Sequence, residues 1–121
     1  MTVAPPVPTL ERAFDVDASL GPMEDHGMTR AGHRRVVPIS SGTVTGLFEA
    51  SILPGGADWQ VVRPDGTVEV DTRYSARTAD GEFVHFRTSG VRTGPPEVIA
   101  VFVASAVREA ARVYYSAYRV T

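Results

Sequence analysis

The chain has 121 residues, a length that suits one domain with a single hydrophobic core. Its net charge of −2 gives no basic field for nucleic acid or an anionic membrane surface, and no apolar run approaches the roughly 20 residues that span a bilayer. Cysteine and lysine are both absent, which excludes disulfides, thiolate catalysis, Cys-ligated zinc and Schiff-base chemistry. We therefore expect neither a nucleic-acid nor a membrane partner.

The N-terminal residues 1–12 are predicted to form a flexible tail. Residues 1–8 contain three prolines, and they lack the basic start and apolar centre of a signal peptide. We therefore expect a cytoplasmic protein, with residues 13–121 forming one domain.

Short runs rich in Val, Thr, Tyr and Phe alternate with Gly and Pro turn signals along most of the chain. Regular short strands with such turns are typical of an all-β sandwich or barrel. The expected strands are Ala13–Leu20, Arg34–Thr43, Leu47–Leu53, Asp58–Arg63, Val68–Thr78 and Glu82–Val91.

The turn after Arg63 predicts the register of the first hairpin. Residues 64–67 read as a four-residue loop around a type I turn, which would set Arg63 opposite Val68. Asp58 would then lie opposite Arg73. Because side chains alternate faces along a strand, Trp59 would share one face with Tyr74, and Asp58 would share the other with Arg73.

The next hairpin turns at residues 79–81, where Gly81 can adopt the left-handed conformation after a type I turn. This loop would set Tyr74 opposite Phe86, and Arg73 opposite Arg87. Two facing arginines repel each other unless an anion lies between them. Asp58, or a carboxylate or enolate of a ligand, could fill that place.

Two interpretations of these faces remain open. The polar face could simply contact water, with Trp59 and Tyr74 filling the core. Alternatively, a bulge at Gly55-Gly56 could bring the ionic and aromatic residues together at the mouth of a pocket. The three histidines, His26, His33 and His85, lack the spacing of a metal site, so no metal is expected.

Residues 98–120 are ambiguous between helix and strand. The segment Val107–Arg112 has good helix-forming residues, whereas Val101–Val103 and Val113–Tyr115 favour strands. The two apolar runs show no polar face, so strands there would be covered on both sides. We therefore expect a homo-oligomer, most simply a two-fold dimer.

Two segments, Gly32–Ile39 and Pro54–Trp59, together resemble the family known as domain of unknown function 3237, DUF3237. The resemblance implies a small antiparallel β-barrel of the lipocalin-like kind with a small-molecule pocket. It also implies that residues 102–105 and 117–120 belong to a C-terminal hairpin turning near Glu109–Ala111. Family members usually carry a longer segment, rich in Tyr, Phe and Arg, between the positions of Pro96 and Val101.

For some members the resemblance implies ring-forming steps in natural-product pathways. The leading hypothesis is therefore a cyclase or isomerase without a cofactor, acting on a polyketide-like intermediate. Asp58 would serve as base, Arg73 would stabilise negative charge and Tyr74 would donate a proton. The expected ligand contacts are Trp59, Arg35, His85, Phe86, Arg87 and Tyr118. The alternatives are a binding protein that holds a small apolar ligand without chemistry, and a purely structural barrel subunit.

Overall fold

The computed structural model describes residues 2–99 and 112–121, and within these ranges it contains eight β-strands. The prediction of an all-β fold is confirmed, and the strand pairs among these residues are antiparallel. The strands are β1 (Leu10–Leu20), β2 (Glu24–Thr29), β3 (Gly32–Gly46), β4 (Ala50–Ile52), β5 (Gly56–Val62), β6 (Val68–Thr78), β7 (Phe83–Arg92) and β8 (Arg112–Val120).

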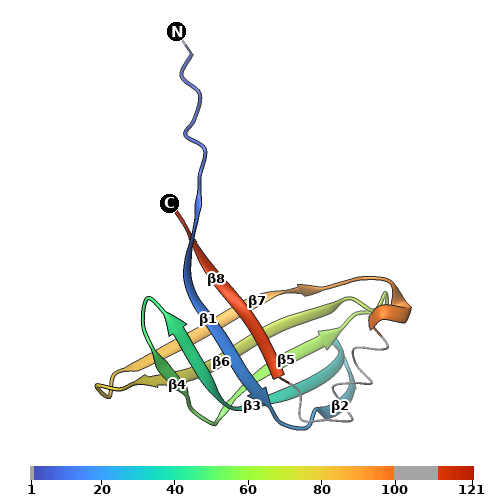
Figure 1. The fold of residues 1–121 in the computed structure, drawn as a ribbon. Helices are drawn as coiled ribbons and strands as arrows, with labels where there is room; N and C mark the ends of the chain where they lie inside the picture. The colour runs from blue at the N-terminus through green and yellow to red at the C-terminus, as the bar shows by residue number, and fades with distance from the viewer. Residues whose placement is uncertain (1, 100–111) are drawn as a thin grey trace.

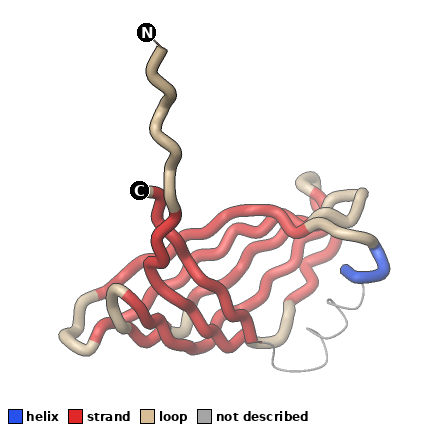
Figure 2. The backbone as a smooth tube through the Cα atoms, turned by 45° about the horizontal axis from the view of Figure 1, so that its top comes forward, coloured by secondary structure: helices blue, strands red, loops and turns tan. Residues whose placement is uncertain are grey.

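The long strand β3 joins two parts of one curved sheet. Its residues 33–39 pair with β5, whereas residues 39–46 pair with β1, and residues 42–44 also pair with β4. β4 in turn pairs with the end of β6, so the strands wrap around a common interior as a small barrel. Figure 1 shows β1 and β8 crossing over the layer formed by β5, β6 and β7. Figure 2 shows the same curved sheet, with its strands in red, from a view turned by 45°.

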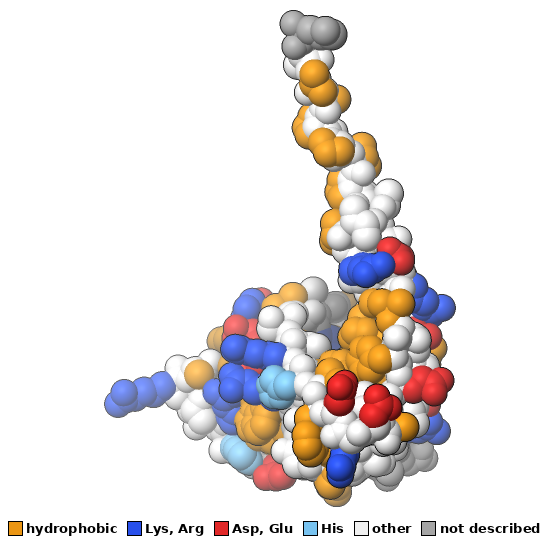
Figure 3. All heavy atoms as spheres, turned by 90° about the vertical axis from the view of Figure 1, so that its left-hand side faces the viewer, with side chains coloured by type: hydrophobic (Ala, Val, Ile, Leu, Met, Phe, Trp, Pro, Cys, Tyr) orange, Lys and Arg blue, Asp and Glu red, His pale blue; other side chains and the backbone are white. Residues whose placement is uncertain are grey.

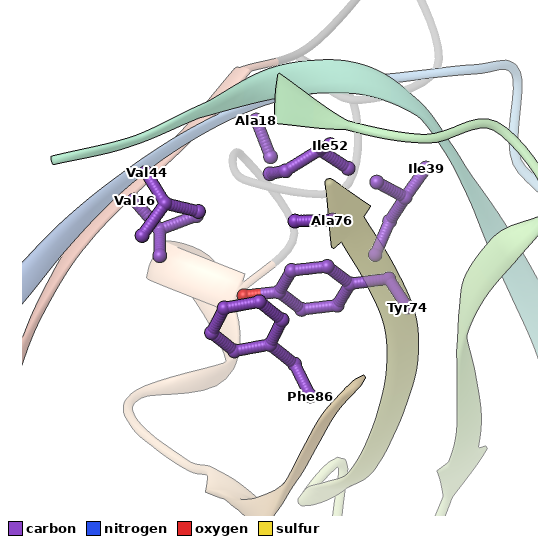
Figure 4. Packing of buried hydrophobic residues seen from close by; sticks show 8 residues of the cluster. All are labelled: Val16, Ala18, Ile39, Val44, Ile52, Tyr74, Ala76 and Phe86. Atoms are coloured by element: carbon purple, nitrogen blue, oxygen red, sulfur yellow. The ribbon is translucent and has the colours of Figure 1, made fainter. Parts of the chain in front are cut away.

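The hydrophobic core lies where these two layers face each other. Tyr74 from β6 stacks on Phe86 from β7, with ring centroids 4.7 Å apart and planes inclined by only 7° (Figure 4). Phe14 meets Phe86 edge-on at 5.6 Å. Smaller residues complete the cluster: Val16, Ala18, Ile39, Val44, Ile52 and Ala76.

The N-terminal strand begins earlier than predicted. β1 starts at Leu10 rather than Ala13, because Leu10 pairs with Val120 and the backbones of Thr9 and Thr121 exchange two hydrogen bonds. Residues 2–9 extend away from the barrel with their side chains exposed (Figure 3).

One strand was missing from the sequence-based prediction. β2 has the sequence EDHGMT, in which charged residues and a glycine hide any alternation of apolar side chains. It forms because it pairs with the first part of β3, and its register shifts between Asp25 and Gly27. Tertiary pairing therefore decides the structure here, and local propensity does not.

The predicted register of the β5–β6 hairpin is wrong by one residue. Val62, not Arg63, lies opposite Val68, and Asp58 lies opposite Thr72, not Arg73. The loop contains three residues, because the amide of Arg63 bonds to the carbonyl of Thr67 at 2.8 Å. Gly66 takes a φ of 87°, the left-handed conformation that completes a type I turn with a bulge.

The β6–β7 hairpin has the predicted register. Tyr74 lies opposite Phe86, and Arg73 lies opposite Arg87. Gly81, with a φ of 90°, provides the same left-handed turn residue that was expected there.

The C-terminal strand of the expected hairpin is present as β8, which pairs with β1 along its length. The other strand, near Val101–Ala104, and the turn near Glu109–Ala111 lie outside the described residues. Residues 96–99 are helical. Within residues 2–99 and 112–121, no helix has the length and apolar character needed to cross a membrane.

Candidate functional site

A pocket opens between the two layers of the barrel, bounded by β1, β3, β5, β6, β7 and β8. Its volume is about 230 Å³, a little below the roughly 300 to 1,000 Å³ typical of sites for drug-sized ligands, so the ligand that it suits is small. Aliphatic side chains such as Val16, Val37 and Val70 form much of the wall. The polar lining residues are Arg35, Asp58, Gln60, Thr72, Tyr74, Thr88, Arg92, Arg112 and Tyr115.

Asp58 is the carboxylate among the described lining residues, and two donors hold it in place. The amide Nε2 of Gln60 donates to Asp58 Oδ2 at 2.8 Å, and the backbone N–H of Asp71 donates to Oδ1 at 3.2 Å. Gln60 lies two residues further along β5 and therefore on the same face. These bonds fix the direction in which the carboxylate faces the pocket.

Gln60 also contacts a buried arginine. Arg35 pairs with Gln60 across β3 and β5, and its Nη2 donates to Gln60 Oε1 at 3.2 Å. Because a guanidinium only donates and a carboxylate only accepts, the orientation of the Gln60 amide between Arg35 and Asp58 is unambiguous. The three side chains form one polar row along the pocket wall.

A pair of tyrosines forms another polar contact of the pocket. The hydroxyls of Tyr74 on β6 and Tyr115 on β8 are hydrogen-bonded to each other. Burial, and then the contact with Tyr115, raise the pKa of Tyr74 well above its ordinary value. Burial also raises the pKa of Tyr115. In such a pair one hydroxyl donates to the other, and the second keeps a proton for an acceptor in the pocket.

A close approach of β5 and β6 positions Tyr74. A Cβ atom at Gly56 would lie 2.5 Å from the Cβ of Tyr74 and 2.6 Å from the carbonyl oxygen of Arg73. Only glycine allows the two backbones to meet this closely. The register with β6 is constant from Ala57 to Val62, but it differs by two residues from the register of β4 with the same strand, so the chain is irregular around the predicted position, Gly55-Gly56.

The structure brings three of the predicted site residues to the pocket: Asp58, Tyr74 and Arg35. Phe86 does not line it but supports the ring of Tyr74 from behind. The predicted separation of Asp58 from Tyr74 is wrong, because the one-residue change of register places both on the inner face.

The other predicted residues lie outside the pocket. Arg73, His85, Arg87 and Tyr118 are exposed, and Trp59 keeps 37% of its surface accessible on the outer face of β5. The predicted face shared by Asp58 and Arg73 and the one shared by Trp59 and Tyr74 are therefore both wrong. Arginines do line the pocket, but they are Arg35, Arg92 and Arg112 and not Arg73.

The facing pair Arg73 and Arg87 does have a carboxylate between its members, as the hairpin argument required. That carboxylate is Asp71 and not Asp58: its oxygens lie 3.5 Å from Arg73 Nη2 and 3.9 Å from Arg87 Nε. The cluster lies on the outer face beside Trp59.

Sequence reasoning missed Gln60, Tyr115 and Arg92 as lining residues. Gln60 is the single glutamine of the chain and shares a strand face with Asp58, which could have singled it out. Tyr115 was hidden in an apolar run, and its side of the strand depends on pairing with β1. Within the described part of the chain, no cluster of three His, Asp or Glu residues could hold a metal ion.

The family model described as "Protein of unknown function (DUF3237)" matches residues 8–120. The chain belongs to the DUF3237 family. A UPF0311 protein of Bradyrhizobium diazoefficiens is 38% identical over 94 residues, which cover 76% of this chain and 62% of that protein. A UPF0311 protein of Clostridium acetobutylicum is 46% identical over 69 residues, covering 56% of this chain and 44% of the relative. The chain thus spans less than two thirds of the length of these curated relatives.

Solved structures of the same fold support the assignment. A conserved protein of unknown function from Rhodopseudomonas palustris superposes with a TM-score of 0.77 at 28% identity, covering 98% of this chain and 78% of that one. A protein from Acinetobacter baumannii described as β-barrel like gives 0.71 at 31% identity, with coverages of 99% and 80%. An enzyme from Penicillium herquei gives 0.71 at 16% identity over the full length of both chains, which shows a shared fold.

Proposed function

We propose that this DUF3237 protein is a cofactor-independent isomerase or cyclase that acts on a small carbonyl compound, such as a polyketide-like intermediate, by acid–base chemistry. The observation that carries the proposal is the pocket itself, where one oriented carboxylate and a hydrogen-bonded tyrosine pair line a mostly aliphatic cavity. A fold shared with an enzyme from Penicillium herquei is consistent with catalysis on this scaffold.

Asp58 is the proton acceptor in this proposal. Its carboxylate takes a proton from the carbon next to a ligand carbonyl, and the electron pair of the broken C–H bond moves to the carbonyl oxygen as an enolate. The hydroxyl of Tyr74 or Tyr115 donates a hydrogen bond to that oxygen, where the negative charge develops. Burial, and then the partner Tyr115, keep Tyr74 protonated by raising its pKa.

The enolate has two proposed reactions, isomerisation and cyclisation, and both conserve atoms and charge. In isomerisation, the protonated Asp58 returns its proton to a different carbon of the conjugated system. In cyclisation, the enolate carbon bonds to a second carbonyl carbon of the same molecule, and the resulting alkoxide takes the proton from Asp58. The pocket favours ring closure because it holds the flexible chain folded, which lowers the entropic part of the barrier.

Exchange of carbon-bound protons tests the proposal without the natural substrate. The probe is 2-tetralone, a small ketone with acidic protons next to its carbonyl, dissolved in D₂O and followed by NMR. We expect the native protein to accelerate deuterium incorporation, and we expect Asp58→Asn to lower that acceleration by roughly 10²-fold or more. Glu69→Gln, which changes an exposed carboxylate on the outer face of β6, is the matched control and should exchange like the native protein.

The result also separates the proposal from its alternative, a non-catalytic protein that binds a small apolar ligand. Binding of 2-tetralone without accelerated exchange would favour that alternative. Equal exchange rates for native protein and Asp58→Asn would remove Asp58 from the catalytic role.

A further inference from the structure

Arg35 is a buried cation with unused hydrogen-bonding capacity. Only 7% of its surface is accessible, yet it lines the pocket. Its Nη2 bonds to Gln60, while its Nε is buried and has no hydrogen-bond partner among residues 2–99 and 112–121. Buried guanidinium donors normally find partners, because leaving one unpaired costs free energy.

The charge of Arg35 is also not neutralised by an ion pair within residues 2–99 and 112–121. Asp58 is separated from it by the amide of Gln60. Burial, followed by the neighbouring charge of Arg92, lowers the pKa of Arg35, and the opposite effects of Asp25 and Asp58 are smaller. An arginine nevertheless stays charged at neutral pH, so the pocket contains a positive charge that lacks a direct counterion.

We propose that Arg35 is an anion-binding subsite and that the ligand of this pocket is a small, largely apolar molecule carrying a carboxylate. The guanidinium of Arg35 would donate to one carboxylate oxygen, and the apolar remainder of the ligand would lie along Val37, Val70 and Val16. This assignment rests on the proposed function only in using the same pocket, and it adds the chemical class of the ligand.

A carboxylate fits better than a neutral oxygen group for an electrostatic reason. A carboxylate is fully ionised at neutral pH, whereas a phenol with a pKa near 10 is not. Only the carboxylate therefore supplies a negative charge to neutralise Arg35. Charge-assisted hydrogen bonds to a guanidinium are also the stronger ones. A ligand anchored in this way would present its other end to the pocket that Asp58 and the tyrosine pair share.

Two probes of nearly identical shape test the subsite by isothermal titration calorimetry at pH 7.5. They are trans-cinnamate, which carries a carboxylate, and cinnamamide, which is neutral. We expect the native protein to bind cinnamate roughly tenfold to a hundredfold more tightly, as a charged hydrogen bond in a buried site provides. Arg35→Met should bind the two probes equally.

The neighbouring arginine on the same strand gives a matched control. Arg34 lies on the opposite face of β3. There it lines an outer hollow, a shallow depression on the outside of the barrel that Trp59 and Asp71 also line. Arg34→Met should therefore keep the full preference for cinnamate. Arg35→Met removes a buried charge that lacks a counterion, which stabilises, and also the hydrogen bond to the buried Gln60, which destabilises, so we expect it to unfold at a urea concentration close to that of the native protein. If that variant does not fold, Arg35→Gln serves in its place, with the same loss of preference expected.

Three outcomes would overturn the assignment: no preference for cinnamate by the native protein, retention of the preference in the Arg35 variants, or its loss in Arg34→Met. A loss of stability in Arg35→Met with both probes weakened alike would show that Arg35 is structural. These outcomes are independent of the exchange test, since a protein that binds cinnamate through Arg35 but never exchanges 2-tetralone would keep the subsite and lose the proposed catalysis.

Discussion

At the scale of single residues, Tyr74 links the hydrophobic core to the chemistry of the pocket. Its ring stacks on Phe86, while its hydroxyl meets Tyr115. The ring is therefore fixed by packing, and the hydroxyl is held by one hydrogen bond and kept protonated by burial. The Phe86 ring and the Tyr115 hydroxyl together fix the Tyr74 side chain, so its hydroxyl proton lies at a defined point in the pocket.

This arrangement predicts a loss of stability at alkaline pH. The pKa of Tyr74 is raised in the folded state above its ordinary value of 10.0, so above pH 10 the unfolded chain binds fewer protons than the folded one. The free energy of unfolding should therefore be unaffected by Tyr74 below pH 10 and fall as the pH rises beyond it, by up to about 1.4 kcal/mol per pH unit. Urea unfolding between pH 8 and 11.5 measures this decline.

Tyr74→Phe provides the comparison. It keeps the ring but removes the ionisable group, so its decline should be smaller than that of the native protein, with Tyr115 responsible for what remains. The chain has no lysine, whose titration would otherwise overlap this window. Identical pH profiles for native protein and variant would contradict the burial of the Tyr74 hydroxyl.

At the scale of strands and turns, the turn that ends at Gly66 sets the register of β5 against β6 and so decides which residues share the pocket. The sequence correctly predicted the three-residue loop at Gly81 but read the similar segment before Gly66 as a loop of four residues. Because of this difference of one residue, Asp58 lies opposite Thr72 and not opposite Arg73, the predicted partner. Asp58, Tyr74 and Arg35 were predicted from the sequence and do line the pocket, whereas the places of Gln60 and Tyr115 beside them depend on pairing between distant strands.

The close contact of β5 and β6 predicts a large effect of a single methyl group. Gly56→Ala would place its Cβ 2.5 Å from the Cβ of Tyr74, so the strands must separate, and we expect a loss of about 1–3 kcal/mol in the free energy of unfolding. Gly90→Ala is the matched control, because the nearest atom to its Cβ would be 3.8 Å away, on Val70. Its stability should stay within about 0.5 kcal/mol of the native value. Urea unfolding of both variants checks the difference, and similar stabilities would contradict the tight packing of β5 on β6.

At the scale of the whole molecule, the outer surface of the β1–β8 pair carries large exposed apolar side chains next to ion pairs such as Arg112–Asp17. Leu10, Tyr114, Tyr118 and Val120 are all largely exposed there. The prediction that strands near Tyr114 are covered on both sides is thus not met within the described chain, and a second copy could supply the cover. We propose a two-fold homodimer through this surface.

Light scattering at micromolar concentration tests the assembly. We expect the mass of a dimer for the native chain, and a shift toward monomer for Tyr114→Glu, which would bury an unpaired charge in the interface. A monomeric native chain at these concentrations would refute the proposal. The barrel and its pocket would be unaffected, because the strand pairs and lining residues that form them lie within one chain.

The proposed chemistry requires that the ligand binds inside the barrel, and a crystal structure of the protein with bound trans-cinnamate tests this most directly. We expect the ligand inside the barrel, with its carboxylate within hydrogen-bonding distance of the Arg35 guanidinium and its ring against Val37 and Val70. Density for cinnamate in the outer hollow beside Trp59, with the inner pocket lacking it, would contradict the assignment of the site.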